Sequence, residues 1–482
     1  MNDLYAVISA LLASWFLWRW LGQTHLGHIP TIGTSVPVLS YIQSLQFFKR
    51  AGEFIQEGYN KHAYNGGVFK VAMPDQWLVV IAGPTMIEEM RRLPEDIASL
   101  LGGGDQSLAT RHVVGTRVAE DPDRMAFVRA RVGRNIPENF NMLQEELTTA
   151  LSSVIGFPDG SLFPSRDQQL LSVFTQFARD YTISRRLIIM FPNILKPIVS
   201  RVFNRTHGSV RAAYTLLAPA IRERRQKAEE CLKTGRVWHD KPNDMLMWAI
   251  ERAVQEGRPD ESVVPSLLFA EYSTVRVEAM NFTQALFRLS ANPQYIASLR
   301  EEVEEALAAN NGRWNKTVVT MLSKMDSFLK ESFRLSGVTH TSMWRQTQKP
   351  VTFSNGTTIP SGVFVAAAAA ATHIDGNLYP NPHTFDPWRF VGCVGQNSLA
   401  TTRPDFLPFG HGRHACPGRH FATYQMKLLL AYIVTKYDLA MDPRLEGKLP
   451  QSITFGTFIF PNPSVRVMMR RRVHYWTSRR WE

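Results

Sequence analysis

The spacing of hydrophobic and polar positions predicts long helices in the second half of the chain. Between residues 293 and 310, apolar side chains recur every three or four positions, at Ile296, Leu299, Val303 and Leu307. That period places them on one face of a helix whose other face carries acidic side chains. Residues 265–290 form a longer, mostly apolar helical run, and residues 322–335 form a third.

Strand patterns are shorter and fewer. Residues 351–353 and 357–359 flank Ser354-Asn355-Gly356, and Asn-Gly is a strong hairpin signal. Residues 77–81 predict another strand. Six alanines at 366–371 favour a helix by propensity, but residues 362–365 lead into them as a strand, so we do not adopt the helix. The pattern predicts a mostly α chain with a small β-sheet, an α+β fold.

The N-terminal region is apolar enough to enter a membrane. Residues 4–18 carry no charge, and residues 4–21 would span about 27 Å as a helix, roughly the thickness of an endoplasmic reticulum bilayer. The alternative is a cleaved signal peptide, which normally starts with positive residues rather than Met1-Asn2-Asp3. Arg19 follows the apolar run, which favours a body in the cytosol. We therefore predict a transmembrane anchor at 1–22, a proline-containing tether at 23–37 and a single domain at 38–482.

Composition narrows the class of protein. The 482 residues are 20% charged and 44% hydrophobic, which excludes a disordered chain, a collagen-like fibre and a polytopic membrane protein. Three cysteines exclude a disulfide scaffold and indicate a reducing compartment. The net charge of +12 favours nucleic acid, an anionic membrane face or an acidic protein as partner.

The segment 406–422 concentrates the residues that carry chemistry. Gly410-x-Gly412-x-x-Ala415 loosely fits a dinucleotide-binding loop, but prolines at 404 and 408 remove the strand that must precede it. A zinc site would require a second pair of ligands besides those offered here, which are His411, His414, Cys416 and His420. No second pair appears in the sequence.

A haem held by one thiolate suits the segment better. A thiolate ligand lies on a turn where backbone N–H groups and positive charge favour the anion, and glycines let the backbone approach a porphyrin. Arg413, His414 and Arg419 supply positive charge for haem propionates. A helix that begins just after Cys416 would direct its positive end at the sulfur.

Three motifs in order resemble the cytochrome P-450 superfamily, and its fungal members in particular. Phe409-x-x-Gly412-x-His414-x-Cys416-x-Gly418 resembles the haem-binding loop, with histidine where the family usually has arginine. Glu331-x-x-Arg334 resembles the family's paired helix motif, and residues 385–390 resemble the segment whose arginine, here Arg389, completes a structural triad.

The resemblance implies a cofactor and its contacts. Haem b would lie between a long crossing helix and the cysteine loop, with Cys416 as the axial ligand of iron. The resemblance also implies cofactor-binding roles for Phe409, Gly412, Arg413, His414, Gly418, Arg129 and Arg345. Arg124 is a rival of Arg129 for the role of early propionate arginine.

The crossing helix departs from the family pattern. The family's acid–alcohol pair, which delivers protons to bound oxygen, falls on Val277 and Glu278, so the alcohol is missing. Ser273 and Thr274 lie one turn earlier and would restore it in a shifted register. Glu278 itself could relay protons, or the substrate's own hydroxyl could complete the relay. Alternatively, Glu278 and Arg276 only bond to neighbouring groups.

The resemblance implies a membrane-anchored monooxygenase in the endoplasmic reticulum membrane, single-pass, with its catalytic domain on the cytosolic face. It would use O2 and electrons from an NADPH-dependent flavoprotein reductase, with no nucleic acid among its partners. Phe455, Thr457 and Phe458 would line the pocket, although loose core packing explains them equally well. The expected substrate is lipophilic: a terpenoid, steroid, polyketide or aromatic of secondary metabolism.

Three alternatives remain open at this point. The protein could be a haem-thiolate isomerase, dehydratase or peroxide-using enzyme that needs no reductase. It could instead be a haem sensor or carrier without turnover, or a membrane scaffold in which the haem is structural.

Overall fold

The computed structural model describes residues 26–73, 76–121, 168–191, 193–392 and 398–472. These described residues form two compact units, one within the bounds Leu108–Ala279 and a larger one within the bounds Met1–Ser107 and Met280–Glu482. The helix α13, Val263–Ala291, begins in the first range and ends in the second. The predicted single domain over 38–482 stays a prediction.

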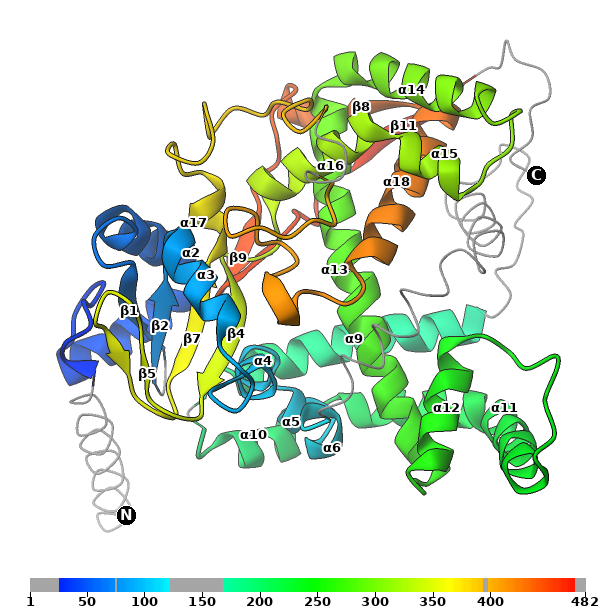
Figure 1. Ribbon diagram of the computed structural model, residues 1–482, viewed down its shortest axis with the longest axis horizontal. Coiled ribbons are helices and arrows are strands. Elements are labelled where there is room, and N and C mark those ends of the chain that lie inside the picture. The colour runs from blue at the N-terminus through cyan, green and yellow to red at the C-terminus, as the bar shows by residue number, and fades with distance from the viewer. Residues whose placement is uncertain (1–25, 74–75, 122–167, 192, 393–397, 473–482) are drawn as a thin grey trace. The chain divides into compact units, whose positions relative to one another are not determined.

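A five-stranded sheet forms one core of the larger unit, in the order β1-β2-β7-β4-β3 (Figure 1). Its strands are β1 Val68–Ala72, β2 Trp77–Ile81, β3 Ala98–Ser99, β4 Thr341–Thr347 and β7 Phe364–Ala368. β2 pairs with β7 in parallel, and the other pairs are antiparallel. A register shift between Ser342 and Arg345 interrupts the pairing of β4 with β7.

Both faces of the sheet are covered at β2 and β7, which explains why these two strands are apolar without alternation. Val79, Val365 and Ala367 pack on one face together with α3, Pro84–Arg92. Leu78 and Ala366 pack on the other together with α2, Pro37–His62. The predicted strand at 77–81 is confirmed.

The alanine run 366–371 divides between two elements. Its first three residues complete β7, and the rest belong to α17, Ala369–His373. Strand pairing on both sides of β7 overrides the helix propensity of alanine for the first half. The decision against a helix was therefore correct only for that half.

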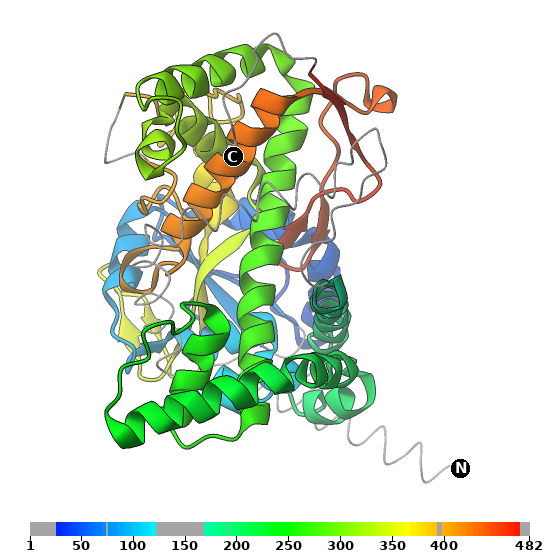
Figure 2. The same ribbon diagram turned by 90° about the vertical axis from the view of Figure 1, so that its right-hand side faces the viewer.

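The remaining helices of the larger unit lie at one end of it, as Figures 1 and 2 both show. They are α14 Ile296–Ala308, α15 Lys316–Met321, α16 Ser323–Ser336 and α18 Arg419–Lys436; α4 Leu100–Leu108 lies beside the sheet. The helices predicted at 293–310, 265–290 and 322–335 are confirmed as α14, α13 and α16. The buried Glu302 of α14 caps α16, because its carboxylate accepts hydrogen bonds from the N–H groups of Lys324 and Met325.

Three two-stranded antiparallel sheets complete this unit. They are β5 Val351–Thr352 with β6 Thr358–Ile359, β8 Tyr437–Met441 with β11 Val467–Arg471, and β9 Ile453–Phe455 with β10 Phe458–Phe460. The first confirms the Asn-Gly prediction, and Gly356 in its turn has a φ of 80°.

The unit Leu108–Ala279 is helical in its described part. It contains α5 Thr110–Val113, α6 Thr116–Ala119, α9 Gln168–Ile188, α10 Lys196–Phe203, α11 Thr206–Thr234 and α12 Met245–Gln255. Its core includes Phe177 and Tyr181 from α9, Ile221 from α11 and Leu268 from α13.

No helix in the described ranges is long and apolar enough to cross a membrane. The predicted anchor at 1–22 and residues 23–25 of the predicted tether lie outside those ranges. Residues 27–36 of the tether are non-helical, and α2 begins at Pro37.

Candidate active site

A buried ion pair on α16 anchors the chain that leads to the cysteine loop. The guanidinium of Arg334 donates two hydrogen bonds of 2.7 Å to the carboxylate of Glu331, and both side chains are fully buried. Arg389 Nε lies 3.2 Å from each Glu331 oxygen. Arg334 also donates to the carbonyls of His373 and Pro382, at 2.6 and 2.7 Å. The structure thus brings the three predicted triad residues together.

Three further polar side chains on the same face of α16 contact segments later in the chain, and the sequence motifs did not mark them. Asp326 Oδ2 accepts a hydrogen bond from the Leu399 N–H at 2.7 Å. Ser327 Oγ accepts one from the Phe390 N–H at 3.0 Å. Lys330, 1% exposed, lies with its ammonium 4.5 Å from the Phe390 ring. The sequence feature that could have identified these three residues is their helical spacing relative to Glu331 and Arg334.

The cysteine loop is a series of tight turns closed by backbone hydrogen bonds. The Gly410 N–H donates to the Leu407 carbonyl at 2.9 Å, and the Cys416 N–H donates to the Phe409 carbonyl at 2.8 Å. Gly410 and Gly412 have φ values of 68° and 78°, which favour glycine. These bonds fix the backbone of Cys416.

Cys416 lies just before α18, as the sequence predicts. The helix begins at Arg419, whose guanidinium donates to the Cys416 carbonyl at 3.0 Å. The cysteine is reduced and half-buried. Apart from Gly418 and its two chain neighbours, no described residue has an atom within 4 Å of the position that a Cβ would take on Gly418. The Phe409 ring packs edge-on against Phe333 of α16, at 5.8 Å.

Two histidines of this loop lie close to glutamate carboxylates. His411 Nε2 lies 3.2 Å from Glu88 Oε2, and His414 Nε2 lies 3.5 Å from Glu95 Oε2. Arg413 between them is exposed. In the described ranges, no group of three or more His, Cys, Asp or Glu side chains could hold a metal ion. This arrangement gives the zinc alternative no support.

Only some of the arginines predicted to bind the haem propionates lie among the described residues. Arg345 on β4 is 2% exposed, and its Nη1 donates to the Trp344 carbonyl at 2.8 Å. Burial lowers its pKa to about 10, against the opposing effect of Glu95. Arg129 and its rival Arg124 lie outside the described residues.

The middle of α13 carries the predicted catalytic residues. Glu278 Oε1 is buried and accepts no hydrogen bond from any described residue, and burial raises the pKa of this carboxyl to about 8. Thr274 is exposed, and its hydroxyl donates to the Ala270 carbonyl at 2.9 Å. Arg276 donates to the hydroxyl of Thr182 on α9. Arg276 therefore bonds to a neighbour, whereas Glu278 keeps an unused buried oxygen.

The predicted substrate-contacting residues lie on the β9–β10 hairpin. The Phe455 ring stacks on Phe48 of α2, with centroids 5.3 Å apart. Thr457 is buried, and its carbonyl accepts a hydrogen bond from the His340 N–H at 2.7 Å. Phe458 forms an antiparallel bridge with Thr339, in the connection between α16 and β4. Their role in substrate binding stays a prediction.

Comparison with known proteins decides the family. The family model described as Cytochrome P450 matches residues 139–469, more than half of the chain. The chain belongs to the cytochrome P450 family. It is 36% identical to Cytochrome P450 monooxygenase 151 of Postia placenta, over 98% of this chain and all of that protein. It is 30% identical to Cytochrome P450 monooxygenase CYP512U6 of Ganoderma lucidum, over 98% of this chain and 97% of that protein.

The fold of this P450 agrees with a solved structure. The crystal structure of a Cytochrome P450 (CYP102L1) superposes with a TM-score of 0.63 at 18% identity, covering 92% of this chain and 99% of that one. The predicted fold class is confirmed, as are monooxygenase chemistry in general and a haem with a cysteine thiolate ligand. A single thiol in a glycine-containing turn before a helix fits such a haem.

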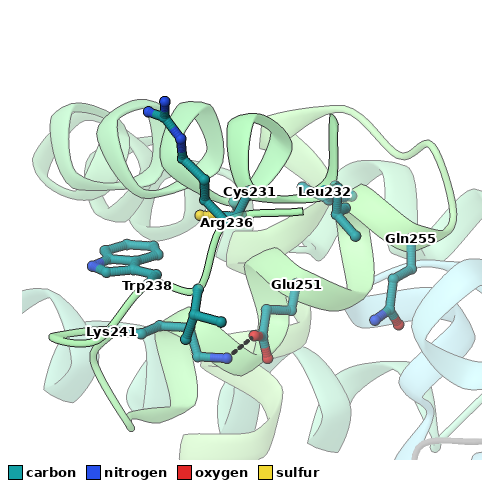
Figure 3. Close-up of a pocket in the computed structure, with 10 residues that line it drawn as sticks. Cys231, Leu232, Arg236, Trp238, Lys241, Glu251 and Gln255 are labelled. Atoms are coloured by element: carbon teal, nitrogen blue, oxygen red, sulfur yellow. Dashed lines mark hydrogen bonds and ion pairs between the residues drawn. The ribbon is translucent and has the colours of Figure 1, made fainter. Parts of the chain in front are cut away.

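A cavity in this P450 is lined by residues away from these motifs in the sequence. It has a volume of about 310 Å³ and lies between α11 and α12 in the unit Leu108–Ala279 (Figure 3). Cys231, Trp238 and the ion pair of Lys241 with Glu251, 2.7 Å apart, line it. None of the predicted site residues lines this cavity.

Proposed function

We propose that this cytochrome P450 oxidises a lipophilic small molecule at a haem whose axial ligand is Cys416. The observation that carries the proposal is the place of Cys416. It follows a turn pinned by backbone hydrogen bonds and precedes α18, whose N-terminus favours an anionic sulfur. The bound haem would supply oxygen activation, with the thiolate favouring O–O cleavage.

The residues of the chain would hold the cofactor and manage protons. Arg345, Arg413 and His414 are the described candidates for the propionates. Glu278 is the proposed proton donor, because a carboxyl group with a pKa of about 8 is protonated at neutral pH. Thr274 would have to give up its hydrogen bond to Ala270 in order to share this role.

Electrons would come from an NADPH-dependent flavoprotein reductase that docks beside the cysteine loop. Arg92 of α3 is exposed beside this loop. α3 packs against the short helix at Gly412–His414. Exposed positive charge at this place suits an acidic partner.

Two exposed apolar stripes support contact with a membrane. Ile194, Ile198 and Val202, on and before α10, recur every four residues and are each more than half exposed. Leu39, Ile42 and Leu45 recur every three residues near the start of α2 and are also exposed. Together with the apolar residues 4–21, they support a single-pass protein of the endoplasmic reticulum membrane with its catalytic domain in the cytosol.

The substrate class follows from this setting. A membrane-bound enzyme receives its substrate from the lipid phase, and the β9–β10 hairpin would offer Phe455, Thr457 and Phe458 to an apolar molecule. A terpenoid, steroid, polyketide or aromatic of secondary metabolism is the proposed substrate.

The experiment that tests the proposal is the carbon monoxide difference spectrum of the reduced, purified protein beside Cys416→Ser. We expect a strongly red-shifted Soret band in the wild type and its loss in the variant. A wild-type band typical of histidine-ligated haem, or an unchanged band in C416S, would show that the ligand is another residue.

The unusual segment around Glu278 favours one second candidate. Thr274 is bonded to the backbone and the family's acid–alcohol pair is absent, so the second candidate is a haem-thiolate isomerase, dehydratase or peroxide-using enzyme. Such an enzyme would need no reductase. Oxygen consumption that depends on added reductase and NADPH separates the two, because only the monooxygenase requires it.

A further inference from the structure

His373 connects the buried ion pair of α16 to the loop that carries Cys416. It is the last residue of α17, and its side chain is only 3% exposed. Its ring lies 5.5 Å from the ring of Phe406, which directly precedes the cysteine loop. All the residues in this connection belong to the larger unit.

Two hydrogen bonds make the connection. Arg334 Nη1 donates to the main-chain carbonyl of His373 at 2.6 Å. The Leu407 N–H donates to the ring atom His373 Nε2 at 2.9 Å. The turn that begins at Leu407 then leads through its own backbone hydrogen bonds to Cys416.

The ring must be neutral in order to accept this bond. Nε2 accepts, so the ring proton lies on Nδ1. Burial, aided by the positive charge of Arg334, lowers the pKa of His373 to about 3. A phenyl ring of similar size would keep the tilted contact with the Phe406 ring but could not accept a hydrogen bond from the Leu407 N–H.

If the His373 ring is lost, the Leu407 N–H group has no ready replacement for this hydrogen-bond acceptor. Leu407 is fully buried, so water does not reach its backbone readily. Pro408 follows and has no N–H, so Leu407 supplies the last backbone donor before Phe409. Loss of the acceptor would leave a buried donor unpaired, and the turn would have to shift to relieve it.

We propose that His373 is a positioning residue for Cys416: its imidazole fixes the backbone of Leu407 and so the start of the turn that presents the sulfur. The proposal rests on the proposed function, which assigns Cys416 as the haem ligand. It adds to the family's three motifs a residue that couples the ion pair to the ligand loop.

The experiment compares His373→Phe and His373→Gln with a matched control in the full-length, haem-containing protein. Tyr59→Phe is the control, because Tyr59 Oη donates to Asp375 Oδ2 at 2.7 Å, two residues beyond His373. Y59F removes one buried hydrogen bond from the same segment and leaves Leu407 untouched. Amide hydrogen exchange over residues 407–416 and the reduced carbon monoxide spectrum are the two measurements.

We expect H373F to raise exchange at Leu407 by about tenfold or more over Y59F and to convert much of the thiolate-type band to a blue-shifted one. H373Q supplies an acceptor oxygen and should recover part of both. If H373F does not fold, His373→Asn, with its shorter acceptor side chain, replaces it and should fall below H373Q in both measurements.

Two results would overturn the proposal: equal exchange and spectra in H373F and Y59F, or no difference between H373F and H373Q. Failure of the proposed function would look different. In that case C416S would keep the wild-type band, while exchange at Leu407 would still respond to H373F.

Discussion

At the scale of single residues, Glu278 combines burial with an oxygen that no described residue uses. Its pKa rises to about 8 through burial, and no compensating cation contributes. Burial also raises the pKa of Glu271 on the same helix. A buried carboxylate without a partner is costly, so the protonated form is favoured at neutral pH. That form can donate a proton.

We expect Glu278→Gln to be more stable than the wild type near pH 8 and little changed near pH 5. The unfolded chain releases this proton around pH 4.5, whereas the folded chain holds it to about pH 8. The folded state therefore binds more protons in this window and loses stability as the pH rises. Glutamine removes that loss, which should amount to about 3–4 kcal/mol between pH 5 and pH 8, at about 1.4 kcal/mol per pH unit. Urea unfolding at both pH values measures it, and an equal difference at both would contradict it.

At the scale of elements, α16 is a helix whose polar side chains are buried. Residues 325–334 are all buried, including Asp326, Lys330 and Glu331. Helical periodicity predicted the bounds of this helix to within about one residue. It could not predict the burial of these polar groups, because burial depends on segments some 60 residues later that cover the helix. Only the Glu331–Arg334 spacing marked one pair in advance.

Arg334→Lys tests the anchor on α16. Lysine keeps the charge but loses the two-point contact with Glu331 and the bonds to the following carbonyls. We expect the free energy of unfolding to fall by about 3–5 kcal/mol, as for a broken buried ion pair. We also expect the variant to lose bound haem. Lys61→Gln, in an exposed pair with Glu57, is the control and should cost less than about 0.5 kcal/mol. Chemical unfolding of both variants measures the two losses in free energy of unfolding. Similar losses would refute the expectation.

At the scale of the whole molecule, stability near neutral pH depends on histidines buried in neutral form. Burial lowers the pKa of His373 to about 3 and that of His340 to about 4. The unfolded chain binds a proton at each near pH 6.5. Below that value the unfolded state binds more protons, so these two residues reduce stability as the pH falls.

We expect the stability advantage of the wild type over His373→Gln to be largest near pH 7 and to shrink toward pH 5. Glutamine does not titrate, so only the wild type loses stability in this window, by up to about 1.4 kcal/mol per pH unit. Denaturant unfolding of both proteins across the range measures the difference. A constant difference would mean that His373 keeps an ordinary pKa in the folded state.

Membrane contact is also a property of the whole molecule, and a chain that lacks residues 1–22 tests it. We expect this chain to keep partial binding to lipid vesicles and to lose most of it on joint Ile198→Glu and Val202→Glu substitution, because charges on an exposed apolar face oppose insertion. Val237→Glu is the control, since Val237 is 74% exposed but lies beyond α11. Vesicle sedimentation measures binding, and equal losses would contradict the expectation.

The sequence by itself determined the family, the long helices, the Asn-Gly hairpin and the residues of the three motifs. These features are local, because periodicity, turn chemistry and short motifs act within a few residues. Tertiary structure alone decided that the alanine run divides between strand and helix, that Lys330 is buried against aromatic rings, and that His373 reaches Leu407. Each of these depends on segments far apart in the chain, whose proximity no local pattern encodes.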